Sequence, residues 1–350
     1  MRHFAALSSL FLLAACAGTS QPIVDALPTA SVPVVRETTA VRTRDDAADD
    51  PAIWRHPGDP ARSLIVSTDK KAGLYVYGLD GRTRSFTPAG RVNNVDLLAD
   101  VKVAGHPAVL VAASDRSDER HAALALYTLT TEGRLAALAR LPAGAGEAYG
   151  ICLWQRAADR ATFAFVVAKD GTIHQLQLDL AGATPLARPV RQLKLATQSE
   201  GCVVDARTAQ LYVGEEDVGV WRFAADPSGA ATPVLFAKAD GRQLVVDVEG
   251  VALAPQGARG GYLLVSSQGD KAYAIYRLED GTYAGRFRLV ANTAGVDGTS
   301  GTDGIELMLG DFGPDFPGGL FVAQDGDNAP ETQNFKLASW RSIAEALKLD

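Results

Sequence analysis

The chain has 350 residues, of which 47% are apolar and 21% charged, with 34 glycines and a formal net charge of −7 at pH 7. This composition excludes a largely disordered chain, and the many glycines are typical of a protein with many turns. The acidic balance lacks the basic surface of a nucleic-acid-binding protein, so we expect no nucleic acid among its partners. Any anionic substrate of such a protein requires cations, which favours bound metal ions.

The N-terminal residues predict export. Arg2 precedes an apolar run over residues 4–13, and its last residue, Leu13, begins a Leu-Ala-Ala-Cys sequence that ends at Cys16. This pattern resembles a bacterial lipobox, and the run is too short for a mature membrane span. We therefore predict a lipoprotein-type signal peptide over residues 1–16, lipidation of Cys16 and anchoring to a bacterial membrane, followed by a tether over residues 17–36. The alternative is an ordinary signal peptide with a periplasmic or secreted product.

Six copies of one unit fill residues 45–340. Each copy places a polar residue before a short, mainly apolar strand, and a second apolar strand and glycine-containing turns follow. The first strands begin at residues 50, 94, 149, 200, 249 and 303, so the period is near 50 residues. Such a period is typical of β-propeller blades, whereas two stacked β-sandwiches, the alternative, predict no equal spacing.

The predicted fold is therefore all-β: a six-bladed β-propeller with four-stranded antiparallel blades over residues 37–350. Closing the ring requires a strand from the other terminus, and residues 32–41 are the candidate. Only residues 340–349 have a helical pattern.

Residues at the same repeat position converge on one end of a propeller channel, because the innermost strand of each blade lines it. The heads of the first strands carry Asp50 (preceded by Asp49), Asn94, Tyr149, Glu200, Glu249 and Asp303. The ends of the second strands carry Lys70, Arg116, Lys169, Glu216, Gln268 and Asp325. Three consecutive blades thus offer cations at the second position, and the other three offer acids or an amide.

Carboxylates that converge in this way need cations, because like charges a few ångströms apart repel strongly. Oxygen ligands suit Ca²⁺ or Mg²⁺, and the sequence has no Cys/His spacing typical of zinc. Ca²⁺ tolerates irregular shells and is the better fit. The basic side chains on the opposite side would hold phosphate oxygens. The alternative is that these polar residues only bind water at the channel mouth.

Two cysteines remain once Cys16 is assigned to the anchor. Cys152 and Cys202 hold equivalent positions on the inner strands of adjacent blades, and an exported protein permits disulfides. We predict that they form a disulfide. The alternative is two small buried hydrophobic side chains.

Several motifs resemble those of the β-propeller phytases, also called alkaline phytases. The likeness runs over residues 37–345, nearly the whole mature chain. The matching stretches are residues 46–54 (Asp-Ala-Ala-Asp-Asp-Pro-Ala-Ile-Trp), 68–74, 93–96, 215–217, 247–250, 266–269, 297–300 and 321–326.

This resemblance implies a catalytic calcium cluster, structural calcium ions and a phosphate-binding surface. The cluster ligands correspond to Glu37, Asp49, Glu200, Glu216, Asp247, Glu249, Gln268 and Asp303. The structural ligands lie near Asp50, Asp297, Asp325 and Asp327. The phosphate-contacting residues correspond to Lys70, Lys71, Arg116, Tyr149 and Lys169. One departure is Gly301, where the family often has an acid.

The expected function is calcium-dependent hydrolysis of phosphomonoesters of inositol phosphates, of the 3-phytase type, by a monomer. We expect the catalytic residues to be Lys70, Arg116, Tyr149, Lys169, Glu200 and Glu216. Two alternatives stay open: another metal-dependent propeller hydrolase, such as a lactonase, and a surface-tethered binding propeller without enzymatic activity. A lactonase has no need for a row of cations.

Overall fold

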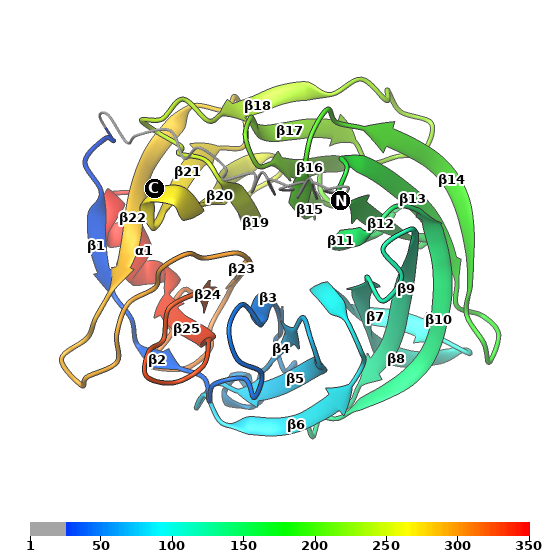
Figure 1. Ribbon diagram of the computed structural model, residues 1–350, viewed down its shortest axis with the longest axis horizontal. Coiled ribbons are helices and arrows are strands. Elements are labelled where there is room, and N and C mark those ends of the chain that lie inside the picture. Colours follow the sequence, from blue (N-terminus) through cyan, green and yellow to red (C-terminus); the bar gives the residue numbers. More distant parts are fainter. Residues whose placement is uncertain (1–25) are drawn as a thin grey trace, which may run out of the picture.

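The computed structural model describes residues 26–350, which form six β-sheets arranged as blades in a ring (Figure 1). Five sheets have four strands, and the fifth blade has one additional strand. The predicted six-bladed propeller is therefore confirmed. The signal peptide and Cys16 lie outside the described residues.

The first three blades each follow the chain from an inner to an outer strand. Blade 1 contains β3 (Ala48–Trp54), β4 (Leu64–Asp69), β5 (Gly73–Gly78) and β6 (Thr83–Pro88), with the short 3-10 helix η1 (Pro60–Arg62) before β4. Blade 2 contains β7 (Val92–Val103), β8 (His106–Asp115), β9 (His121–Leu129) and β10 (Leu135–Ala145). Blade 3 contains β11 (Ala148–Gln155), β12 (Thr162–Ala168), β13 (Thr172–Asp179) and β14 (Leu186–Lys194).

The last three blades complete the ring. Blade 4 contains β15 (Ser199–Asp205), β16 (Gln210–Glu215), β17 (Gly219–Ala224) and β18 (Val234–Lys238). Blade 5 contains β19 (Val248–Gln256), β20 (Gly260–Ser267), the 3-10 helix η2 (Gln268–Asp270), β21 (Ala272–Arg277), β22 (Tyr283–Val290) and β1 (Ala30–Pro33). Blade 6 contains β23 (Ile305–Leu309), β24 (Gly319–Asp325), β25 (Asn334–Ser339) and β2 (Arg36–Glu37), and helix α1 (Trp340–Leu347) follows it.

A strand near the N-terminus and a strand near the C-terminus pair in blade 6 and close the ring. β2 pairs antiparallel with β25, so Glu37 lies opposite Lys336. The candidate closing segment, residues 32–41, contains this strand. β1 pairs parallel with β22 and extends blade 5.

The predicted tether is wrong in its second half. Residues 30–33 are a strand of the propeller, and the amide of Leu27 donates to the carbonyl of Arg242. The physical reason is that Val32 and Val34 are buried in the core of blades 5 and 6, which a solvated tether would leave in water.

The apolar core lies between neighbouring blades rather than within one sheet. β4, β5 and β12 are buried along their whole length, whereas the outer strand β6 is largely exposed. One typical cluster joins Phe163 and Phe165 of blade 3 to Leu211 and Val213 of blade 4. Each blade is therefore held by its two neighbours, and the ring fixes where the inner strands begin.

A disulfide links the inner strands of blades 3 and 4. Cys152 of β11 and Cys202 of β15 are bonded, with their Cα atoms 5.8 Å apart. Cys152 is also buried in the core between these two blades. Within residues 26–350, no helix is long and apolar enough to cross a membrane.

Reduction of this disulfide should destabilise the propeller. The bond closes a loop across 50 positions of sequence, so chain-entropy arguments give a loss of about 4 kcal/mol in the free energy of unfolding. The measurement is urea denaturation of the wild type with and without a thiol reductant. The matched control is a Cys152→Val/Cys202→Val variant, whose stability should not respond to reductant. An equally small response in both proteins would contradict the expectation.

Candidate active site

The site begins with a ring of equivalent residues where the six inner strands enter. In blades 1 and 5, the pairing of the first and second strands is irregular near the start of the inner strand, and regular pairing resumes at Pro51 in blade 1 and at Val251 in blade 5. These two residues are therefore equivalent. The residue two positions before Pro51 is Asp49, so Asp49, not Asp50, is equivalent to Glu249. The residues of this ring are Asp49, Asn93, Tyr149, Glu200, Glu249 and Asp303.

The predicted ring members Asp50 and Asn94 are therefore wrong by one residue. Each follows a residue of the same kind, so the polar pattern alone does not select the register, and a one-residue shift turns a side chain to another face. Asp50 lies deeper in the channel, where its Oδ2 accepts from the amide of Val95 at 3.0 Å. Burial and the nearby Asp49 and Glu306 carboxylates raise its pKa well above the usual value.

The ring at the end of the second strands needs a similar correction in blade 6. Ala323 pairs with Ile305 in blade 6, as Ser67 pairs with Pro51 in blade 1, so Ala323 and Ser67 are equivalent. Lys70 lies three residues after Ser67, and the residue three positions after Ala323 is Gly326, not Asp325. The other five predicted positions directly follow their strands, as expected.

Glycines after four ring residues let neighbouring inner strands touch. A Cβ atom on Gly150 would lie 2.0 Å from the carbonyl oxygen of Glu200, and one on Gly201 would lie 2.5 Å from that of Glu249. The amide of Gly250 donates to the carbonyl of Asp303 at 2.9 Å. These contacts bring the ring side chains together.

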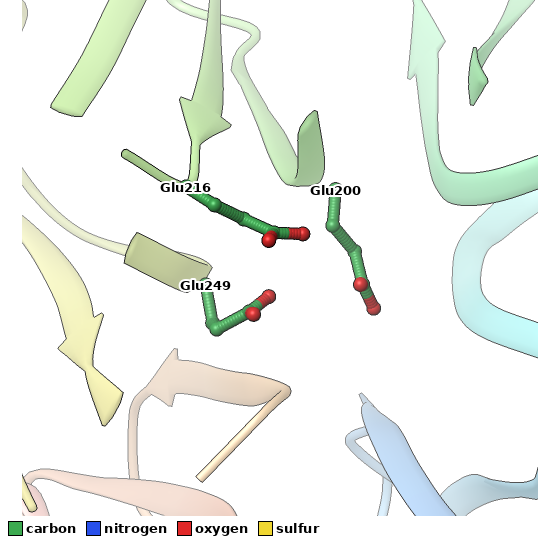
Figure 2. A group of neighbouring side chains, drawn as sticks. All are labelled: Glu200, Glu216 and Glu249. Atoms are coloured by element: carbon green, nitrogen blue, oxygen red, sulfur yellow. The ribbon is translucent and has the colours of Figure 1, made fainter. Parts of the chain in front are cut away.

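Three glutamates converge at this end of the channel. One carboxylate oxygen from each of Glu200, Glu216 and Glu249 lies within 4.8 Å of the others, and Figure 2 shows the side chains pointing toward one space. Glu200 and Glu249 belong to the inner-strand ring, whereas Glu216 directly follows β16. Sequence equivalence predicted all three.

The protonation of these glutamates reflects their crowding. Burial raises the pKa of Glu200 and of Glu249 well above the ordinary value, and repulsion adds to this, first from Asp49 for Glu200 and first from Glu216 for Glu249. Burial also raises the pKa of Glu216 to about 7 and that of Asp303 to about 7. The group is thus unfavourable as a set of bare anions and is stabilised by a cation or by protons.

The donor set fits a hard metal ion. All three ligand atoms are carboxylate oxygens, the type that calcium and magnesium prefer. Within residues 26–350, Oε1 of Glu216 and Oε2 of Glu249 are buried and have no hydrogen-bond partner. Since buried polar atoms are normally satisfied, these two oxygens are available as ligands for a cation.

Lys70 contacts carboxylates rather than standing free in the cavity. Its Nζ lies 2.7 Å from Asp46, 2.9 Å from Asp49 and 3.1 Å from Asp303. Burial opposes the charge, but Asp49 and Asp303 outweigh it and raise the pKa of Lys70. Lys70 therefore stays protonated and joins blade 1 to blade 6. Sequence reasoning missed the role of Asp46.

Arg116, Tyr149 and Lys169 form one continuous surface. The Arg116 guanidinium lies 5.4 Å and Lys169 Nζ 4.9 Å from the centre of the Tyr149 ring. Burial, followed by repulsion from Glu200 and other carboxylates, raises the pKa of Tyr149, so its hydroxyl stays neutral. Asn93 accepts from Arg116 Nη1 at 2.5 Å and donates to Glu200 Oε1 at 2.8 Å. Asn93 thus connects the basic surface to the glutamates.

A cavity of about 520 Å³ lies over the cluster. The predicted residues that line it are Lys70, Tyr149, Glu200, Glu216, Asp247, Glu249, Gln268, Asp303 and Asp327. Lining residues outside the predicted set are Asp46, Gln198, Lys271, Ser300, Gly301, Gly326 and Gln333. Lys71, exposed, donates instead to the carbonyl of Arg44. Lys271 was missed because it lies three residues beyond Gln268, the repeat position at the end of its strand.

A second acidic group surrounds the buried Lys336. Its Nζ contacts Asp297 and lies 2.6 Å from Glu37 and 3.2 Å from Asp325. Glu37 was expected in the catalytic cluster, but it contacts Lys336 and does not line the cavity. Asp325 and Asp297 thus share one group, whereas Asp50 lies apart in the channel.

Comparison with known proteins agrees with this site. A family model described as phytase matches residues 1–350. A 3-phytase of Bacillus subtilis (strain 168) is 38% identical over 328 residues, covering 89% of this chain and 84% of that protein. A crystal structure of a functionally unknown protein from Desulfotomaculum acetoxidans DSM 771 is 14% identical with a TM-score of 0.46, covering 71% of this chain and 74% of that one. That last likeness is too weak to carry an argument. The whole-chain match and the 38% identity confirm the resemblance found in the motifs, and the chain belongs to the phytase family.

Proposed function

We propose that this protein is an exported, calcium-dependent phosphomonoester hydrolase of the 3-phytase type, which releases phosphate from phytate and from lower inositol phosphates. The observation that carries the proposal is the convergence of three glutamate oxygens within 4.8 Å beside the Arg116–Tyr149–Lys169 surface. Membership of the phytase family and the similarity to a 3-phytase support the substrate.

Glu200, Glu216 and Glu249 would hold the catalytic calcium, with Asp49, Asp247, Gln268 and Asp303 as further candidate ligands. A bound calcium ion lowers the pKa of a coordinated water and draws charge from phosphate oxygens. The glutamates lie on two adjacent inner strands and one strand end, so their carboxylates are positioned by the blades rather than by mobile loops. Asp297, Asp325 and Asp327 are candidates for a structural ion, and Asp50 for a separate site in the channel.

The phosphate to be cleaved would lie against the basic surface. Asn93 accepts from Arg116 Nη1 and so orients the guanidinium, whose remaining N–H groups can donate to phosphate, and Lys169 supplies a point charge. The neutral Tyr149 hydroxyl donates a hydrogen bond to a phosphate oxygen and does not add negative charge. These groups stabilise the charge of the transferring phosphoryl group.

Lys70 has a double role in this proposal. Its ammonium balances Asp49 and Asp303, which would otherwise repel the neighbouring glutamates and the substrate. It also lines the cavity, so its positive charge reaches a bound phosphate. The exposed Lys71 would contribute at the rim.

The row of cations separates this proposal from the alternatives. A lactone has no phosphate charge, so Arg116 and Lys169 would be unused in a lactonase. A binding propeller without activity would not need carboxylate oxygens gathered around a cation beside a phosphate site. We further propose that the protein acts as a monomer and that its anchor is a lipid on Cys16.

Calcium removal should abolish activity and lower the melting temperature. Phosphate released from phytate and from phenyl phosphate is measured with calcium, with excess chelator and after calcium is restored. Because ions that bind only the folded state stabilise it by mass action, the melting temperature should fall in chelator and recover with calcium. Phosphate release that survives exhaustive chelation would overturn the mechanism.

Substitutions on the two sides of the site should fail in different ways. Glu200→Gln removes a charged ligand atom, so the calcium concentration for half-maximal activity should rise by about tenfold or more. Lys169→Ala removes a phosphate contact, so activity should fall by about 100-fold while the calcium midpoint stays within about twofold of wild type.

The control for Lys169→Ala is Lys194→Ala, an exposed lysine of the same blade that pairs with Asp170, whereas Lys169 lies over the Tyr149 ring. Its activity and calcium midpoint should match wild type. The division between metal-binding and phosphate-binding sides is wrong if Lys169→Ala and Glu200→Gln shift the calcium midpoint equally.

Replacement of Cys16 should release the enzyme without altering turnover. A lipid on Cys16 is the proposed attachment to the membrane, so Cys16→Ser should move activity from the membrane to the soluble fraction. Turnover should stay unchanged, because the described residues that line the cavity lie between positions 46 and 333 and do not include Cys16. Unaltered fractionation would favour an ordinary signal peptide.

A further inference from the structure

Lys271 is a cation on the side of the cavity that otherwise carries acids. It directly follows η2 in blade 5, and it lines the same cavity as Glu216, Glu249 and Asp247. The predicted phosphate-binding cations come from blades 1 to 3, and blade 5 lies across the ring from blade 2 (Figure 1). Lys271 therefore approaches a bound substrate from the opposite wall.

The backbone of Lys271 is held in an uncommon conformation. Its φ angle is +57°, in the left-handed region that side chains other than glycine and asparagine rarely occupy. Its amide donates to the carbonyl of Gln268 at 3.1 Å. The preceding Asp270 accepts from Ser267 at 2.7 Å and pairs with the fully buried Arg286. These contacts fix the turn, so Lys271 has a defined starting point at the cavity wall.

The ammonium of Lys271 lacks the partners that the other lysines near the cavity have. Lys70 and the buried Lys336 each contact three carboxylates, and Lys169 lies over Tyr149. Within residues 26–350, Lys271 forms no ion pair. An exposed, unpaired ammonium on the wall of a site for anions has its full charge available for a ligand.

The same side of the cavity has room for a substrate group. Gly301 and Gly326 both line it. A Cβ atom on Gly301 would meet no atom within 4 Å, so space is open there. Asp327 also lines this side, and the positive charge of Lys271 would offset the repulsion between the Asp327 carboxylate and a phosphate.

We infer that Lys271 binds a substrate phosphate that is not the one cleaved, and that it determines specificity for substrates carrying several phosphates. This inference rests on the proposed function. The scissile phosphate lies against Arg116 and Lys169, and an inositol ring positions a second phosphate toward the opposite wall. A substrate with a single phosphate occupies only the first position and does not reach Lys271.

The test compares phytate with phenyl phosphate in a Lys271→Asn variant. Asparagine tolerates the left-handed backbone, so the substitution removes the charge and keeps the turn. The KM for phytate should rise about fivefold while kcat stays unchanged, because an exposed charge contact affects binding only modestly. The kinetics on phenyl phosphate should equal wild type. Added salt should narrow the difference in KM for phytate.

Two further variants complete the test. Lys271→Arg keeps the positive charge and should restore the wild-type KM. Lys348→Asn is the matched control: it also follows a helix in the left-handed conformation, with φ of +55°, but lies outside the cavity. It should leave both substrates unaffected.

Three outcomes would overturn the inference: an unchanged KM for phytate in Lys271→Asn, an equal change on both substrates, or a loss of kcat. The second and third would place Lys271 with the groups that act on the cleaved phosphate. Failure of the proposed function is distinct, since the wild-type enzyme would then release no phosphate from phytate.

Discussion

Close contact between neighbouring inner strands is the constraint on which the site depends. At Gly150 and at Gly201, a backbone carbonyl oxygen of the next blade packs so closely that a Cβ atom would collide with it. The glycine that follows a ring residue therefore determines how near the next ring residue comes. Because four of the six blades repeat this arrangement, side chains separated by about 50 residues in sequence meet within a few ångströms. The Cys152–Cys202 bond fastens the same junction between blades 3 and 4.

The crowded carboxylates of the ring repel one another, and neighbouring residues offset part of this repulsion. Lys70 balances Asp49 and Asp303 on the blade 1 side, and Asn93 donates to Glu200. On the other side, buried oxygens of Glu216 and Glu249 have no hydrogen-bond partner among the described residues. In the proposed function, the position of the glutamates beside Arg116 and Lys169 would put a bound metal ion next to a bound phosphate.

The repeat made the architecture predictable, whereas the register depended on details that the sequence pattern does not contain. Equal spacing of apolar strands predicted the six blades, and equivalent positions placed Glu200, Glu216 and Glu249 together. The prediction failed at Asp50 and Asn94, where two like residues stand in tandem and only the ladder selects one. The repeat pattern also does not predict contacts between residues at different repeat positions. Glu37 was expected in the catalytic cluster, but it pairs with the buried Lys336 instead.

The pairing of β2 with β25 has a consequence for how the molecule is made. Glu37 and Lys336, which lie opposite each other in this pair, are 299 residues apart, so the ring stays open until almost the entire polypeptide exists. Contacts of such long sequence separation form slowly, since the loop between them must be ordered first. A nascent chain that lacks its last blade has no partner for β2 and keeps that strand accessible. Late ring closure is therefore compatible with the proposed export, in which the chain would cross a membrane before it folds.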